Sequence, residues 1–162
     1  MTDRSVIHDS FTIERSYLAM PSRVFAAFAT VDAKSNWATI EGHKGTDEQV
    51  VPAEFDFRIG GRERFGFVRL GTLYRYDARY YDIVPDQRII YSYEMYAADS
   101  RISVSVATIE FTDHGDGTAL TWTEQGAFLD GFDGDEAPAL RIAGTTEMIN
   151  HLPRYLNADV PG

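Results

Sequence analysis

The sequence predicts an α+β fold, in which a curved antiparallel sheet of about seven strands wraps around a long C-terminal helix. Two short helices are expected after the first strand. The first observation is that apolar and polar residues alternate in short segments separated by glycine, proline and aspartate turns, a pattern typical of hairpin-connected strands. The second is that a long helical pattern occurs near the C-terminus, over 140–157. Because one helix rarely fills the concave side of such a sheet, this order of elements also predicts a cavity between helix and sheet.

The first strand is expected over 11–17, where apolar residues occupy alternate positions. Pro21 then begins a short helix, because its fixed φ and missing N–H are tolerated at the first helical position. A second short helix is expected over 32–37. Asp32 is a candidate N-cap for it.

A hairpin is expected within "EFDFRIGGRERFGF", residues 54–67. A turn over 60–62 keeps its aromatic residues on one face, because opposed residues of an antiparallel pair share a face. This register pairs Ile59 with Glu63, Phe57 with Phe65, and Phe55 with Phe67. It places Glu63 on the aromatic face near the tip, where we expect water access, since burying an unpaired carboxylate costs several kcal/mol.

Four further strands are expected over 72–84, 88–96, 101–112 and 119–128. The C-terminal helix presents an apolar stripe with helical spacing, formed by Thr145, Met148, Ile149, Leu152, Tyr155 and Leu156. Pro153 lies inside this stripe. We expect it to kink the helix, because it removes the hydrogen bond to the Ile149 carbonyl.

Composition restricts the location and partners of the protein. At 162 residues and 44% hydrophobic content, one domain over residues 1–162 is expected. Fifteen basic and 25 acidic residues give a net charge of −10, which disfavours nucleic acid and anionic membranes as partners. Cysteines are missing, and the N-terminus lacks an apolar signal core, so a cytoplasmic protein is expected. The expected oligomeric state is a monomer or a homodimer. No segment approaches the ~18 apolar residues of a membrane-spanning helix.

Five segments carry a resemblance to a known superfamily. They are "RSYLAMPSRVFAAF" from Arg15, "FDFRIGGRERF" from Phe55, "DARYYDIVPDQRIIYSYEM" from Asp77, "SVATIEF" from Ser105 and "TEQGAFLDGFD" from Thr123. Together they resemble the START-like (helix-grip, SRPBCC) superfamily, and specifically the bacterial proteins similar to the activator of heat-shock-protein-90 ATPase homologue, also described as polyketide-cyclase-like. The resemblance implies one domain with a hydrophobic cavity between sheet and helix. It does not imply one reaction, because many functions share one fold.

Two classes of function follow. The first is binding of a small hydrophobic ligand, aromatic or polyketide-like, in that cavity, with cyclase-type or lyase-type catalysis left open. The alternative is a protein-interaction module resembling a chaperone ATPase activator domain. Neither H-E-x-x-H nor G-x-S-x-G occurs, so neither a metal site nor a serine-hydrolase site is expected, and no cofactor is implied.

Glu124 is the candidate catalytic residue. In the last strand it shares a face with Leu120 and Trp122, and a carboxylate on an apolar wall either pairs with an arginine or has a raised pKa suited to acid–base catalysis. Structural pairing is the alternative, with Arg64, Arg79 or Arg141 as possible partners. Glu94 is a second candidate, although the sequence does not show which face of its strand is concave.

Aromatic residues with polar tips suit a pocket for a planar apolar ligand with a few oxygens. The candidate ligand-binding residues are Trp37, Phe57, Phe65, Tyr74, Tyr93, Trp122, Glu124 and Met148. The alternative is that the tyrosines are ordinary sheet residues, since tyrosine favours strands. A row of small side chains, Ser103, Ser105 and Ala107, would leave room for a ligand if it faces inward.

Overall fold

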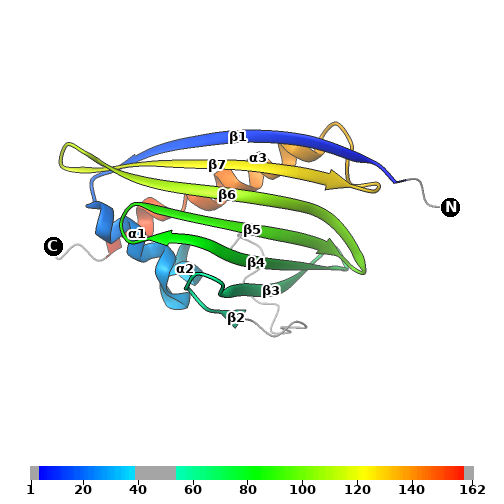
Figure 1. Ribbon diagram of the computed structural model, residues 1–162, viewed down its shortest axis with the longest axis horizontal. Helices are drawn as coiled ribbons and strands as arrows, with labels where there is room; N and C mark the ends of the chain where they lie inside the picture. Colours follow the sequence, from blue (N-terminus) through cyan, green and yellow to red (C-terminus); the bar gives the residue numbers. More distant parts are fainter. Residues whose placement is uncertain (1–3, 39–53, 159–162) are drawn as a thin grey trace.

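The computed structural model describes residues 4–38 and 54–158. Its strands are β1 (Val6–Tyr17), β2 (Glu54–Phe55), β3 (Arg62–Arg69), β4 (Thr72–Val84), β5 (Arg88–Ala97), β6 (Ser100–His114) and β7 (Gly117–Leu129). Its helices are α1 (Pro21–Ala29), α2 (Val31–Trp37), α3 (Ala137–Ile149) and α4 (Leu152–Ala158). The strands form one antiparallel sheet in the order β1-β7-β6-β5-β4-β3-β2, and α3 lies behind β1, β7 and β6 in Figure 1. The predicted α+β helix-grip fold is therefore confirmed.

The core lies on the face of the sheet that the helices cover, which we call the inner face. Phe28 of α1 occupies its centre, with ring centroids 4.7 Å from Trp37, 5.5 Å from Phe111 and 6.1 Å from Trp122. The Trp37 indole N–H is satisfied by the Ala27 carbonyl at 2.8 Å. These contacts fix α1 and α2 against the sheet, because they bury large apolar area and leave the indole N–H paired.

The short helix α2 begins differently from the prediction. Thr30 is its N-cap, and the Thr30 hydroxyl accepts a hydrogen bond from the Ala33 N–H at 3.2 Å. Asp32, the predicted cap, lies in the first turn, where its charge still favours the helix N-terminus.

The C-terminal helical segment is divided where a kink was predicted. α3 ends at Ile149 and α4 begins at Leu152, with the His151 N–H bonded to the Met148 carbonyl. Pro153 thus stands in the first turn of a new helix. In the first turn of a helix the backbone N–H groups have no intrahelical acceptor, so proline loses no hydrogen bond there. The segment therefore forms two separate helices and not one kinked helix.

The predicted register of the 54–67 hairpin is wrong. Phe55 pairs with Glu63, not with Phe67, and the connection 56–61 is longer than a three-residue turn. The backbone at Gly61 packs directly against the backbone at Asp56, since a Cβ on Gly61 would lie 2.0 Å from the Asp56 carbonyl oxygen. Ile59, predicted to face Glu63, lies in this connection and is exposed.

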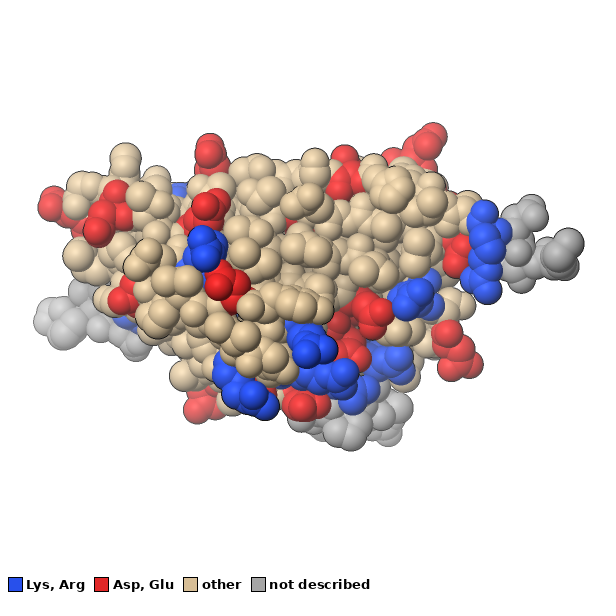
Figure 2. Space-filling view, in the orientation of Figure 1, with Lys and Arg blue, Asp and Glu red and all other residues tan. Residues whose placement is uncertain are grey.

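The outer face of the sheet differs in character from the inner face. In Figure 2 charged side chains gather most densely over one part of the molecule, and uncharged surface predominates over the rest, with a few further charged groups within it. Ion pairs on the outer face include Arg101 with Glu94 at 3.1 Å and Arg64 with Asp77 at 3.5 Å. Glu94 therefore faces outward, while Tyr91 and Tyr93 of the same strand are buried on the inner face. None of the described helices is long and apolar enough to cross a membrane.

Candidate functional site

A buried polar cluster lies on the inner face where α3 crosses the sheet. Arg141 of α3 donates from Nη1 to the Tyr93 hydroxyl at 2.8 Å and to the Ser105 hydroxyl at 3.3 Å. Its Nη2 donates to the Ser103 hydroxyl at 2.8 Å. The predicted row of small side chains does face inward, and the room that Ser103 and Ser105 leave is occupied by the guanidinium.

Glu124 completes this cluster. The Tyr93 hydroxyl donates to Oε1 of Glu124, and the Trp122 indole N–H donates to Oε2 at 3.2 Å. Arg141 Nη1 lies 3.9 Å from Oε1, so the cation reaches the carboxylate mainly through the tyrosine hydroxyl. The geometric prediction is confirmed: Glu124 is on the inner face with Trp122 and is bonded to a tyrosine.

Of the three arginines considered as partners, Arg141 is the one beside Glu124. Arg64 pairs with Asp77, and the Arg79 guanidinium lies 5.7 Å from the ring centroid of Tyr81. Sequence spacing could not select among the three, because the choice depends on where α3 crosses the sheet.

Burial sets the protonation of this cluster. Burial raises the pKa of Glu124, against the opposing effects of the Tyr93 hydrogen bond, Arg141 and the Trp122 indole. Burial also raises the pKa of Tyr93, against the lowering effect of Arg141. Tyr93 therefore keeps its proton and acts as the donor to Glu124, while Glu124 is able to exchange a proton at higher pH than an exposed glutamate.

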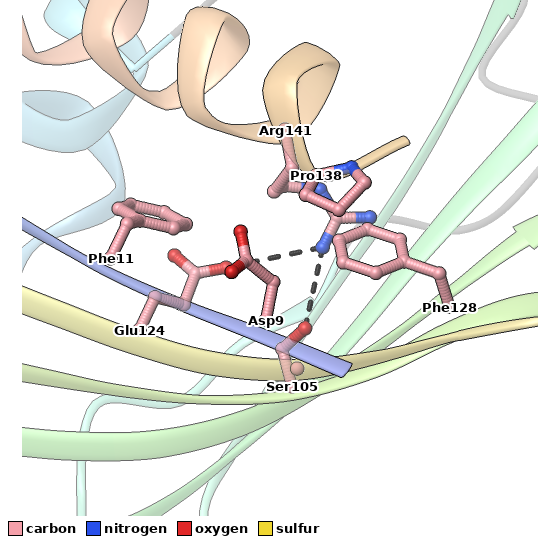
Figure 3. A pocket seen from close by; sticks show the side chains of 8 residues that line it. Asp9, Phe11, Ser105, Glu124, Phe128, Pro138 and Arg141 are labelled. Atoms are coloured by element: carbon pink, nitrogen blue, oxygen red, sulfur yellow. Dashed lines mark hydrogen bonds and ion pairs between the residues drawn. The ribbon is translucent and has the colours of Figure 1, made fainter. Parts of the chain in front are cut away.

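A hollow of about 10 Å³ adjoins the cluster (Figure 3). Its lining residues are Asp9, Phe11, Ser105, Glu124, Gly126, Phe128, Pro138 and Arg141. This volume holds about one water-sized group. The hollow is thus smaller than the ligand cavity that the order of elements predicts.

Two lining residues, Asp9 and Gly126, lie opposite one another in β1 and β7, and neither is among the predicted site residues. The alternation that places Phe11 on the inner face extends back to Asp9, so an earlier start for the first strand would have found it. Gly126 leaves room for a neighbour, because a Cβ there would lie 2.7 Å from the Ser105 hydroxyl oxygen. That space lets Ser105 bond to Arg141.

A second buried cluster lies on the same face nearer the edge of the sheet. Glu63 Oε2 accepts from Lys34 Nζ at 2.6 Å and from the Tyr80 hydroxyl at 2.8 Å. Glu63 is only 7% exposed, so the predicted position at a rim with water access is wrong. The cost that argued against burial is met by a direct cation partner from α2.

The predicted ligand-binding residues do not all come together. Tyr93 and Trp122 both donate to Glu124, beside Arg141, as described above. Trp37 is core, Met148 packs at the core edge, and Phe57 contacts Phe25 and Tyr80.

Phe65 and Tyr74 lie farther out, on β3 and β4. Phe65 stacks on Tyr76 at 4.8 Å, and Tyr74 stacks on Phe67 at 5.3 Å. Within 4–38 and 54–158, no group of three or more His, Asp or Glu side chains is arranged to hold a metal ion.

Two solved structures from rhizobia are similar to this chain in both sequence and fold. A protein from Rhizobium leguminosarum is 38% identical, with a TM-score of 0.84, over 98% of this chain and 100% of that chain. The protein Mll3558 from Rhizobium loti is 45% identical, with a TM-score of 0.81, over 93% and 99% of the two chains. A search of the curated proteins gave no significant match.

A more distant likeness concerns the fold alone. DynU16, a protein of the dynemicin biosynthetic locus, is 19% identical over 94% of this chain and 49% of that chain, with a TM-score of 0.61. The family model described as "Activator of Hsp90 ATPase homolog 1-like protein" matches residues 18–157, which include β2 to β7, the helices α1 to α3 and all of α4 except its last residue. The chain therefore belongs to the family of Activator of Hsp90 ATPase homolog 1-like proteins.

Proposed function

We propose that this protein binds a small hydrophobic molecule with an aromatic ring, between the inner face of the sheet and α3. One observation carries the proposal: the hydrogen-bonded cluster of Arg141, Tyr93 and Glu124 is buried in a largely aromatic wall beside a hollow. Buried charged groups are weak contributors to stability, since apolar residues of similar volume often stabilise a fold as well. A few polar groups converging in an apolar surface are instead typical of ligand sites.

The hollow would enlarge if the first half of α3 moved away from the sheet. Thr145 and Ile149, both in the second half, are the buried residues of α3, and Leu140 is 67% exposed. Arg141 thus anchors the first half mainly through hydrogen bonds. Segments with few buried apolar contacts open locally at low free-energy cost, so a ligand could displace this half-helix without unfolding the core.

Catalysis is an extension of this proposal. Glu124 and Tyr93 form a hydrogen-bonded carboxylate–phenol pair of the kind that can move a proton at a bound carbonyl compound. The polyketide-like class of ligand is supported by the shared fold of DynU16, a protein of the dynemicin biosynthetic locus. A cyclase-type or lyase-type reaction would use Glu124 as the proton acceptor.

The second candidate function is a protein-interaction module. The family description and the small volume of the hollow favour it, because a hollow of this size holds only a small group and a partner protein would bind the outer surface instead. On either function we propose a cytoplasmic protein of one domain, monomeric or homodimeric. Its charge of −10 argues against nucleic acid as a partner.

Extraction of the purified protein followed by mass spectrometry tests the proposal. We expect an aromatic or polyketide-like hydrophobe in near-stoichiometric amount, and much less of it in the Arg141→Met variant. Arg88→Met is the matched control, because Arg88 pairs with Asp82 outside the cluster. If no hydrophobe accompanies the wild-type protein, or if both variants retain it equally, the interaction function is favoured.

A further inference from the structure

The hollow beside Arg141 presents more hydrogen-bond acceptors than donors. The carboxylates of Asp9 and Glu124 and the guanidinium of Arg141 all line it, and Figure 3 shows them directed toward one another. Asp9 makes no side-chain hydrogen bond or ion pair with the other residues that the structure describes. Two carboxylates thus face one cation.

Most of the donors of Arg141 are already engaged. Nη1 donates to Tyr93 and Ser105, and Nη2 donates to Ser103. A guanidinium has five N–H donors, so one on Nη2 and the one on Nε have no partner among the described residues. Each oxygen of Glu124 accepts one hydrogen bond and has a further lone pair. The two oxygens of Asp9 accept no hydrogen bond from the described residues, so both remain free to accept one.

The volume gives a second, independent restriction. About 10 Å³ accommodates a group with one heavy atom, such as a hydroxyl, but not the three heavy atoms of a carboxylate. Phe11, Phe128 and Pro138 form the apolar part of the lining. The attached ring exceeds this volume, so it is placed beside Phe11 and Phe128 where the first half of α3 moves outward, as the proposed function requires.

We propose that the polar end of the ligand is a neutral hydroxyl on an aromatic ring, donating to Asp9 or Glu124 and accepting from Arg141. This inference rests on the proposed function and names the class of ligand. A hydroxyl can donate a hydrogen bond to a carboxylate and accept one from the guanidinium, whereas an ammonium group cannot accept from Arg141. An aromatic carboxylate would add a third negative charge beside two others.

Affinities for two probes with the same ring test this proposal: 2-naphthol and 2-naphthoate, measured near neutral pH by isothermal titration calorimetry. A naphthol hydroxyl is neutral there and a naphthoic acid is ionised. We expect 2-naphthol to bind at least about tenfold more tightly, because like charges within ~4–6 Å disfavour ionised groups by this order. Asp9→Asn and Glu124→Gln each remove one charge and should narrow the preference by raising the affinity for 2-naphthoate.

Glu94→Gln is the matched control, since Glu94 pairs with Arg101 on the outer face and should leave both affinities unchanged. Because Asp9 is only half-buried, Asp9→Asn keeps the test available even if Glu124→Gln folds poorly. Equal affinities, or tighter binding of 2-naphthoate by the wild-type protein, would overturn the hydroxyl proposal while ligand binding itself stands. Failure of both probes to bind would overturn the hydroxyl proposal and the proposed function together.

Discussion

Two buried glutamates on one face of one sheet are neutralised in different ways. Glu63 contacts a cation directly, with Lys34 Nζ at 2.6 Å, and accepts a second hydrogen bond from Tyr80. Glu124 accepts from a phenol and an indole, and its nearest described cation, Arg141, is 3.9 Å away. The Glu63 cluster is closed by its own ion pair, whereas the Glu124 cluster keeps donors and acceptors facing a hollow.

The helices that supply the two cations explain the difference. Lys34 belongs to α2. The buried side chains of Ala33 and Trp37 pack this helix against the core. Arg141 belongs to the half of α3 that lacks buried apolar residues. The first cation is held by apolar packing and the second by the hydrogen bonds it makes, so the first cluster suits structure and the second suits an exchangeable ligand.

The largest effect is expected from breaking the direct ion pair. Lys34→Met keeps the length and apolar stem of the side chain but leaves Glu63 buried without its cation. We expect a loss of about 3 kcal/mol or more in the free energy of unfolding, measured by urea denaturation, since an uncompensated buried charge is strongly destabilising.

The double variant Lys34→Met/Glu63→Gln is the control for this prediction, because it removes both charges. It should recover a large part of the lost stability, as apolar or neutral replacements of a buried pair often do. If Lys34→Met costs less than about 1 kcal/mol, the ion pair is no stronger than an exposed one and the contrast between the clusters fails.

A second comparison uses the two tyrosines. Tyr93→Phe removes two hydrogen bonds, one from Arg141 and one to Glu124, and should cost about 2–3 kcal/mol because buried polar groups lose partners. Tyr80→Phe removes a single bond to Glu63, which keeps Lys34, and should cost about 1 kcal/mol. Thermal unfolding of the two variants beside the wild type measures both. Equal losses would mean that the Arg141 bond to Tyr93 adds nothing.

The strand pattern of the sequence predicted most of this fold. Alternation placed Trp122 and Glu124 on the inner face, and β4 has the predicted bounds. The hairpin register failed because the backbone around Gly61 makes a longer connection, whose geometry does not show in alternation. The register differs from the predicted one by an even number of residues, so Phe55 and Glu63 still share a face, as predicted.

The candidate site was predicted less completely, for a physical reason. A period of two assigns a face to each strand residue but does not place a helix over it, so Lys34 could not be assigned to Glu63. Arg141 could not be chosen over Arg64 and Arg79 for the same reason. Asp9 was missed because the first strand begins at Val6, earlier than its apolar alternation indicates.

The smallest effect, and the one most specific to the Glu124 cluster, is a change in the pH dependence of stability. Burial raises the pKa of Glu124 above its ordinary value of 4.5, so the folded state holds this proton after the unfolded state has released it. The wild type therefore loses this contribution to its unfolding free energy as pH rises from 4.5 through the folded pKa. Glu124→Gln has no such proton, so its stability relative to the wild type should be higher near pH 7 than near pH 4 in urea denaturation. Glu94→Gln on the outer face is the control and should show no comparable change of relative stability with pH. If the stability of Glu124→Gln relative to the wild type falls as pH rises, the effect of Tyr93 and Arg141 on the pKa of Glu124 outweighs that of burial.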